Sequence, residues 1–243
     1  MPSEQFADRD VRETFVALSD LLYAGADPTE VHQALVEAAP ELIDGCDRAS
    51  ILMLVGDRFR STGSTDAVAR FIDQIELETG EGPCLDAIVE ESVQHVADLR
   101  DGSSPWRDFT KRVLTETPVR SAIGYRLLIG GKKVGALNLF SDTPGALGAE
   151  AVNQGAVLAA FASVSLLALS ARAEAESLRA GLQSNREIGK AVGLLMAAHK
   201  VQAEDAFDIL KRTSQDLNMK LSSVAAQVVE GQQEQFRSLT PDA

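Results

Sequence analysis

The chain has 243 residues, of which 45% are hydrophobic and 24% charged, and this composition excludes wholly disordered, collagenous and membrane-embedded chains. The formal net charge is −13, which argues against nucleic-acid binding if the charge is spread evenly. The charge is uneven, because residues 181–243 carry seven Lys and Arg against eight Asp and Glu, a balance of −1. A nucleic-acid-binding segment at the C-terminal end is therefore not excluded.

Three features of the sequence indicate the compartment. Two cysteines are too few for a disulfide framework, and residues 1–10 lack the pattern of a secretory signal. The longest uncharged stretch, residues 151–171, is diluted by Asn, Gln and Ser, which favours a core helix over a bilayer span. We therefore expect a cytoplasmic protein with no membrane partner.

Helices and strands are mixed in the first 147 residues. Asp27 and Pro28 are typical of a helix N-cap and a first helical position, and Gly130-Gly131 between two apolar runs predicts a hairpin. Because strands and helices do not alternate strictly, the pattern favours an α+β fold over a doubly wound sheet. The expected helices are residues 4–23, 28–42, 65–77, 84–91 and 105–113, and the expected strands are residues 49–55, 58–64, 93–98, 121–128 and 134–140.

A long helix is expected over residues 148–200, with an interruption near Gly181, because this span contains no proline and is rich in Ala and Leu. Residues 171–184 within it predict an exposed linker or a coiled-coil seam between two subunits. A weak heptad trace through this region consists of Val164, Ala168, Ala171, Ala175, Leu178 and Leu182.

The last 60 residues predict three short amphipathic helices. The first has Ile188 on its apolar face, and the second covers residues 203–215 with Phe207 and Leu210 on its core face. The third is expected to begin with Asn218 as its N-cap and to end at Gly231. Together they predict a three-helix module with a small core.

Parts of this module resemble a known family. The segments are residues 186–196 (REIGKAVGLLM), 206–210 (AFDIL) and 214–221 (SQDLNMKL), followed by Val224 and Ala225. In this order and spacing they resemble the ANTAR domain, an RNA-binding module of bacterial transcription antiterminators. The family usually has a lysine between the alanine and the glycine of the first helix, where this chain has Val192. This departure implies a lower affinity for RNA or a different set of contacts.

The remainder of the chain resembles, more loosely, a GAF domain of the kind that precedes ANTAR modules in actinobacterial proteins. Residues 80–87 (GEGPCLDA), the Gly130-Gly131 hairpin and the helices at both ends carry the resemblance. It implies an α+β fold with a GAF-like antiparallel sheet flanked by helices, a long connecting helix and an all-α three-helix ANTAR module. The expected divisions are a GAF-like sensor domain over 1–170, a helical linker over 171–184 and an ANTAR domain over 185–243.

The candidate RNA contacts are cations and amides outside the expected apolar faces. Cations contact phosphates, whereas Gln215 or Asn218 can read an unpaired base. The alternative is that these positions are ordinary solvated ones, with Lys211 and Arg212 complementing a helix C-terminus. Spacing alone favours the alternative, and the ANTAR resemblance shifts the balance to RNA. The full set is Arg186, Lys190, Lys211, Arg212, Gln215, Asn218 and Lys220.

Cys84, Trp106 and Phe109 are candidates for lining a ligand pocket in the GAF-like domain, with core packing as the alternative. The thiol near a helix start is also a weaker candidate for a reactive cysteine. Because GAF domains bind very different small molecules or none, no cofactor is identified and any ligand is unknown. The three histidines lie far apart in the sequence, so neither a metal site nor a catalytic site is expected.

These features predict an RNA-binding transcription antitermination regulator that is not an enzyme. The resemblance implies a partner RNA with two hairpins in the nascent transcript, and a homodimer would supply one ANTAR domain for each hairpin. One open alternative is a helix-turn-helix DNA-binding factor, for which Lys220 and Gln227 are a thin set of base contacts, so DNA is the less favoured partner. The other is a signalling or scaffold protein whose tail binds a protein.

Overall fold

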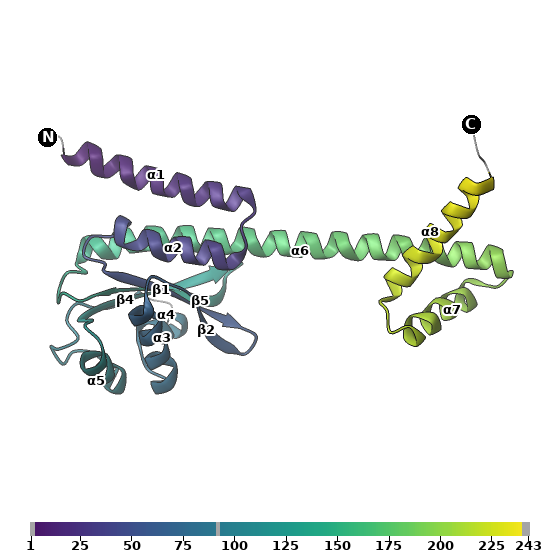
Figure 1. Ribbon diagram of the computed structural model, residues 1–243. Helices are drawn as coiled ribbons and strands as arrows, with labels where there is room; N and C mark the ends of the chain where they lie inside the picture. Colours follow the sequence, from purple (N-terminus) through teal and green to yellow (C-terminus); the bar gives the residue numbers. More distant parts are fainter. Residues whose placement is uncertain (1–2, 91–92, 240–243) are drawn as a thin grey trace. The chain divides into compact units, whose positions relative to one another are not determined.

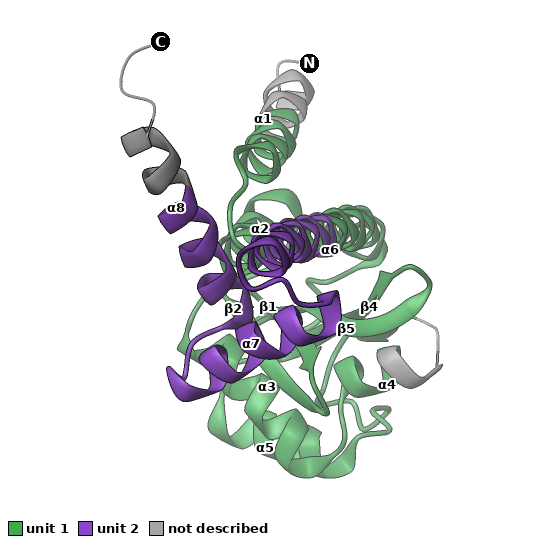
Figure 2. Cartoon of the chain, turned by 90° about the vertical axis from the view of Figure 1, so that its right-hand side faces the viewer, with its two compact units in different colours: residues 1–171 green, residues 172–243 purple. Residues whose placement is uncertain are grey.

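The computed structural model describes residues 3–90 and 93–239 of the chain (Figure 1). The chain divides into two compact units, residues 1–171 and residues 172–243, drawn in green and purple in Figure 2. The first unit is α+β and the second is helical. One long helix, α6, contributes residues to both.

The first unit is built on a five-stranded sheet in the order β2-β1-β5-β4-β3, in which all neighbouring strands are antiparallel. Strand β5 is the central strand, and its Leu137 is paired with Ile51 of β1 on one side and with Tyr125 of β4 on the other. The antiparallel sheet predicted from the sequence is therefore confirmed. Its strands are β1 (Arg48–Val55), β2 (Arg58–Ser64), β3 (Gln94–Val96), β4 (Ser121–Ile129) and β5 (Lys132–Ser141).

Helices cover both faces of the sheet (Figure 1). The helices α1 (Ser3–Ala24), α2 (Pro28–Leu42) and the N-terminal part of α6 (Ala149–His199) lie on one side. The helices α3 (Ala67–Thr79), α4 (Pro83–Glu90) and α5 (Arg107–Glu116) lie on the other.

Local sequence signals account for several of these boundaries. Asp27 caps α2, because its carboxylate accepts hydrogen bonds from the Thr29 and Glu30 N–H groups at 2.7 and 3.1 Å, and Glu30 completes a capping box. Gly130 and Gly131 join β4 to β5 with φ angles of +56° and +79°, as the primed turns of tight hairpins require. Both features were predicted from the sequence and both are confirmed.

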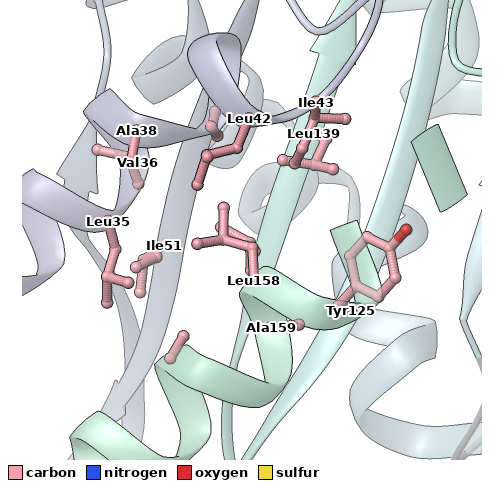
Figure 3. Packing of buried hydrophobic residues seen from close by; sticks show 14 of the residues in the cluster. Leu35, Val36, Ala38, Leu42, Ile43, Ile51, Tyr125, Leu139, Leu158 and Ala159 are labelled. Carbon is pink, nitrogen blue, oxygen red and sulfur yellow. The ribbon is translucent and has the colours of Figure 1, made fainter. Parts of the chain in front are cut away.

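The core on the α2 and α6 side of the sheet is continuous (Figure 3). Leu35 of α2, Ile51 of β1, Leu139 of β5 and Leu158 of α6 are all buried in it. One side of α6 thus belongs to the first unit's core up to Leu166, whereas Val157 and Val164 on its other side are exposed. On length and composition alone, α6 is the one helix among the described residues that could cross a membrane.

The second unit consists of the C-terminal part of α6 with α7 (Ala203–Asp216) and α8 (Leu221–Leu239). The interruption expected near Gly181 is absent, because α6 is continuous from Ala149 to His199. The third helix also continues past Gly231, where an end was expected. The unit's buried core is small, as predicted, and consists of Ala191, Leu210, Val224, Ala225 and Val229.

Candidate nucleic-acid interface

The turn between α7 and α8 presents a rigid polar segment. The Asn218 N–H donates to the Gln215 carbonyl at 3.2 Å, and the Met219 N–H donates to the Ser214 carbonyl at 3.0 Å. The Ser214 hydroxyl in turn donates to the Met219 carbonyl at 2.6 Å. These hydrogen bonds define the backbone conformation of the turn, and therefore the positions of the Cα atoms that carry the exposed Asn218 and Lys220 side chains.

Asn218 has a different structural role from the one expected. It has a φ of +51°, the left-handed conformation that commonly follows the last residue of a helix. The next helix begins at Leu221, and the Lys220 carbonyl accepts from the Ser223 and Val224 N–H groups. Asn218 therefore ends α7, and its prediction as the N-cap of the third helix is wrong.

The seven candidate RNA contacts are all exposed. Five of them, Lys211, Arg212, Gln215, Asn218 and Lys220, follow one another along the end of α7 and the turn into α8.

The other two candidates, Arg186 and Lys190, lie on α6. Lys190 forms an ion pair with Glu187, with 2.9 Å between Nζ and Oε1, so a carboxylate lies next to this cation. Among the described residues, no hydrogen bond or ion pair links the α6 cations to the five residues near the turn. The structure thus yields two groups of candidates, of which the group at the turn is the more continuous.

Phe207 is not in the core, although its apolar character placed it there in the sequence. Its side chain is 40% exposed and lies outside the cluster formed around Leu210. The positions around the helix explain this exposure. At about 100° per residue, Leu210 lies about 40° from Ala206, whereas Phe207 lies about 100° from Ala206. An apolar stripe centred between Ala206 and Leu210 leaves Phe207 at its margin.

Val192 is half-buried and packs against the core of the second unit. At this position the chain therefore has an apolar contact where the ANTAR pattern usually has a cation. The exposed Lys190, two residues earlier, is on a different side of α6. Any phosphate contact from this part of the helix has to come from Lys190 or Arg186.

The three pocket candidates of the first unit are buried, and the structure does not bring them together. Trp106 and Phe109 pack edge to face, with ring centroids 6.3 Å apart, in a cluster with α3 side chains. The Trp106 indole N–H donates to Asp86 Oδ2 at 2.7 Å. Cys84 lies in a separate small cluster with Leu52 and Ala136. All three side chains pack against other protein side chains. Their role in lining a ligand pocket remains a prediction.

Burial raises the pKa of the Cys84 thiol well above its usual value. The thiol is fully buried, so it is held protonated, whereas a reactive cysteine needs a lowered pKa and some exposure. Burial of the thiol therefore argues against the weaker prediction of a reactive cysteine at this position.

Two buried carboxyl groups on α3 were missed by the sequence analysis. Asp73 Oδ1 accepts from the Ser50 hydroxyl at 2.6 Å and from the Asn138 amide at 3.1 Å. Glu76 Oε1 accepts from the Cys84 N–H at 2.9 Å, at the start of α4. Asp73 Oδ2 and Glu76 Oε2 are buried without a hydrogen-bond partner among the described residues. Burial and the proximity of two carboxyl groups both disfavour their ionised forms, so the stability of this region should depend on pH.

The close packing around Glu76 explains the glycine at position 82. Gly82 has a φ of +148°, and a Cβ added there would lie on the Glu76 carboxyl group. The segment of residues 80–84 therefore folds directly over this carboxyl. The motif that carries the GAF resemblance in this chain covers a buried acid.

Two family models match the chain. The model for the GAF domain matches residues 25–166, which is more than half of the sequence, and the model for the ANTAR domain matches residues 176–229. The chain belongs to the GAF- and ANTAR-domain proteins. The recognition made from residues 80–87 and from the segments after residue 186 is confirmed.

Solved structures support the fold of the GAF domain. A domain of a protein assigned as a two-component sensor histidine kinase, from Sinorhizobium meliloti, is 16% identical with a TM-score of 0.51 and covers 63% of this chain and 99% of its own. The photosensory core module of a Stigmatella aurantiaca phytochrome is also 16% identical, with a TM-score of 0.52, and the match covers 83% of this chain and 43% of that one. At this identity the likeness shows the fold alone. The comparison with curated proteins gives no match.

The pair of domains fits a signal-regulated antitermination regulator. ANTAR domains are generally RNA-binding modules, and GAF and ANTAR domains are typical of soluble proteins. In the apolar part of α6, Leu158, Ala162 and Leu166 are buried in the GAF core, whereas Val157, Val164 and Leu167 are exposed.

The GAF domain also has a groove beside α6. Its volume is about 430 Å³, and Tyr125 and Arg126 of β4 line it together with Ala156, Ala159 and Ser163 of α6. The Ser163 hydroxyl accepts from the Leu128 N–H at 3.2 Å, which joins the helix to the strand at this point. A molecule in this groove would contact the helix that continues into the ANTAR domain.

Proposed function

We propose that the protein is a cytoplasmic transcription antitermination regulator in which a GAF sensor domain controls an ANTAR domain that binds hairpin loops in nascent RNA. The observation that carries the proposal is the exposed set of cations and amides along the end of α7 and the turn into α8, in a domain of a generally RNA-binding family. Cations supply contacts to phosphates and amides supply contacts to unpaired bases. The protein acts by binding, without catalysis.

The partner in this proposal is an RNA with two hairpins, and the protein binds it as a homodimer. Support for a dimer comes from α6, where Leu178 and Leu182 are 63% and 70% exposed and Val164 is also exposed. Exposed apolar residues repeated at heptad spacing need a partner, and a second α6 has the same repeat. A dimer then offers two ANTAR domains to two linked hairpins, which raises the effective concentration for the second contact.

The regulatory step follows from the continuity of α6. A ligand changes RNA binding only if it binds two arrangements of the protein with different affinities. The groove beside β4 places a ligand against α6 itself. The GAF domain therefore has a direct route by which an occupant alters the helix shared with the ANTAR domain.

The RNA proposal predicts a loss of affinity when cations near the turn are removed. Lys211→Ala and Arg212→Ala are each expected to weaken binding to a two-hairpin RNA roughly five-fold. Each should also reduce the slope of log affinity against log salt concentration by about one, as expected for the loss of one phosphate contact. Titrations of the full-length protein at two salt concentrations measure both effects. The matched control is Lys111→Ala, at an exposed position on α5 of the GAF domain, which should leave binding unchanged.

The same titration separates the competing functions. Tighter binding to duplex DNA than to hairpin RNA would contradict the proposal and favour a helix-turn-helix factor. The absence of salt-dependent binding to either nucleic acid would favour a protein partner for the ANTAR domain. Equal binding to RNA with scrambled loops would leave a non-specific phosphate contact and remove hairpin recognition.

The dimer proposal predicts that charge on the α6 apolar trace separates the subunits. The double change Leu178→Glu and Leu182→Glu places like charges at the seam, so the dimer should dissociate at least ten-fold more readily, as measured by sedimentation equilibrium. Arg179→Glu, at an exposed position off the trace, is the control for added negative charge. A doubly substituted protein that stays dimeric would show that the subunits associate elsewhere.

A further inference from the structure

Phe207 is the single aromatic side chain described between residues 172 and 232. It is 40% exposed, in a domain whose core has five buried alanine, valine and leucine side chains and seven partly buried apolar side chains packed against them. A phenylalanine normally makes a large contribution to a core by burial. Its exposure in a domain with so little apolar volume indicates that the ring has a use outside the core.

The neighbours of Phe207 form a single exposed row. Lys211 and Gln215 follow at four-residue intervals and are both exposed, so the three side chains lie along one side of α7. Successive members are about 6 Å apart along the helix axis. The row thus presents a ring, then a cation, then an amide, and ends near the α7–α8 turn with its exposed Asn218.

Charge gives the row a direction. Glu204 and Asp205 are exposed in the first turn of α7, on the N-terminal side of Phe207, and Asp208 is exposed directly after it. The nearest cations, Lys211 and Arg212, lie farther toward the turn, with Asp216 beyond them, so a phosphate is attracted on the C-terminal side of the ring. A nucleic-acid strand that contacts the ring therefore has to continue toward Lys211 and the turn.

We propose that Phe207 stacks on an unpaired base of the RNA hairpin loop, with Lys211 contacting the phosphate beside that base and Gln215 within reach of a base edge. This inference rests on the proposed RNA-binding function and assigns a loop-binding role to a residue outside the charged set. Single-stranded RNA loops are recognised by stacking of splayed bases on aromatic side chains together with backbone contacts.

The composition of the row favours an RNA base over a protein helix or a second copy of the chain. A docked helix needs an apolar stripe with anchors at several consecutive turns. Here the positions four before, four after and seven after Phe207 are Ala203, Lys211 and Ser214. One large apolar residue followed by a cation matches a base and its phosphate, and it is too small a surface for a helix.

The test uses the full-length protein and a two-hairpin RNA with 2-aminopurine at one loop position at a time. Phe207→Leu keeps the apolar side chain and removes the ring face, so binding should weaken roughly ten-fold while the salt dependence stays the same. Phe207→Trp should keep wild-type affinity. For one loop position, the 2-aminopurine fluorescence should be quenched by wild type and by Phe207→Trp, and much less by Phe207→Leu.

The matched control is Ile209→Ala. Ile209 is 36% exposed on the same helix but lies about 160° around it from Phe207, so its truncation should not change RNA binding. Thermal melting of each variant separates a loss of contact from a loss of structure, because Phe207→Leu should melt with wild type. Lys211→Ala should reduce the salt dependence, which distinguishes its phosphate contact from the stacking contact.

The outcomes separate the inference from the function on which it rests. Wild-type protein that binds no hairpin RNA overturns the proposed function and the stacking contact together. Wild-type binding that Phe207→Leu leaves unchanged overturns the stacking contact alone. A Phe207→Leu variant that changes the oligomeric state but keeps RNA affinity overturns it also, and assigns the ring to a contact between subunits.

Discussion

The stability of the GAF domain is expected to fall as the pH rises through the range in which Asp73 ionises, and Asp73→Asn should remove much of this dependence. Asp73 is fully buried, and burial raises the pKa of its carboxyl group to about 6. Burial, reinforced by the neighbouring Asp73, raises the pKa of Glu76 well above its usual value. Both groups are more easily ionised in the unfolded chain than in the folded domain.

The direction follows from the protons bound in each state. Below the unfolded pKa of 3.8, Asp73 is protonated in both states and has no effect on the pH dependence. Between 3.8 and about 6, the unfolded chain loses the proton first, so the free energy of unfolding decreases as the pH rises. A difference of about two pKa units corresponds to about 3 kcal/mol, and the loss from Asp73 is complete above its folded pKa.

One buried group acts in the opposite direction within this window. Burial lowers the pKa of His32, so its contribution to stability is lost as the pH falls below the unfolded value of 6.5. The pH profile of the wild type alone is therefore a sum of opposing effects. The difference between wild type and Asp73→Asn cancels His32, which is present in both proteins, and reports Asp73 together with its effect on the pKa of Glu76.

Urea unfolding at pH 5 and pH 7.5, followed by the fluorescence of the chain's single tryptophan, Trp106, measures this difference. Asp73→Asn keeps an acceptor for the Ser50 hydroxyl and should gain about 1.5 kcal/mol of stability relative to wild type between the two pH values, because about half of the 3 kcal/mol is already lost at pH 5. Asp57→Asn, at an exposed hairpin position, is the control and should follow wild type. Parallel profiles for wild type and Asp73→Asn would show that the buried carboxyl does not ionise in this range.

The acidic cluster also shows where prediction from the sequence stops. The spacing of Ile72 and Ile75 predicted an amphipathic helix, and α3 confirms it. Asp73 and Glu76 follow those residues by one position, about 100° around the helix, where solvent is the ordinary expectation. They are buried because the sheet and α4 enclose a second side of α3, and that tertiary contact leaves no periodic signal in the sequence.

A similar limit applies to the ANTAR domain. Its three helices and its small core follow from apolar spacing. The exposure of Phe207 and the left-handed conformation of Asn218 depend instead on the path of the chain between α7 and α8. Asparagine is common both as an N-cap and in the left-handed conformation after a helix, so the residue type alone does not distinguish the two roles. Nearly all of the fold was predictable, whereas the shape of the candidate surface needed the structure.

Leu210→Ala is expected to unfold the α7–α8 part of the ANTAR domain and leave the GAF domain intact. Leu210 is 1% exposed and is the largest of the five buried side chains in this core. Truncation of a buried leucine to alanine costs about 2 to 5 kcal/mol, and a helical unit of this size has a stability of only a few kcal/mol. Loss of this side chain therefore removes most of the stability of the domain.

Two signals should separate in this variant. Thermal melting followed by circular dichroism should show loss of helix at a lower temperature, while the Trp106 fluorescence reports an unchanged transition in the GAF domain. Leu217→Ala, at a position that is 56% exposed, is the control for leucine removal and should stay within about 0.5 kcal/mol of wild type. A single transition at the wild-type temperature for Leu210→Ala would show that α7 and α8 are stabilised by contacts beyond this core.

The same variant links the core to RNA binding. The candidate residues at the end of α7 and in the turn keep their arrangement only while Leu210 and Val224 hold α7 and α8 together. Leu210→Ala should therefore weaken hairpin binding at 37 °C much more than any single surface substitution. RNA that binds the folded ANTAR domain and not the unfolded one shifts the folding equilibrium toward the folded domain. Saturating two-hairpin RNA should therefore raise the temperature of the first transition of Leu210→Ala. RNA with scrambled loops should leave that transition where it is.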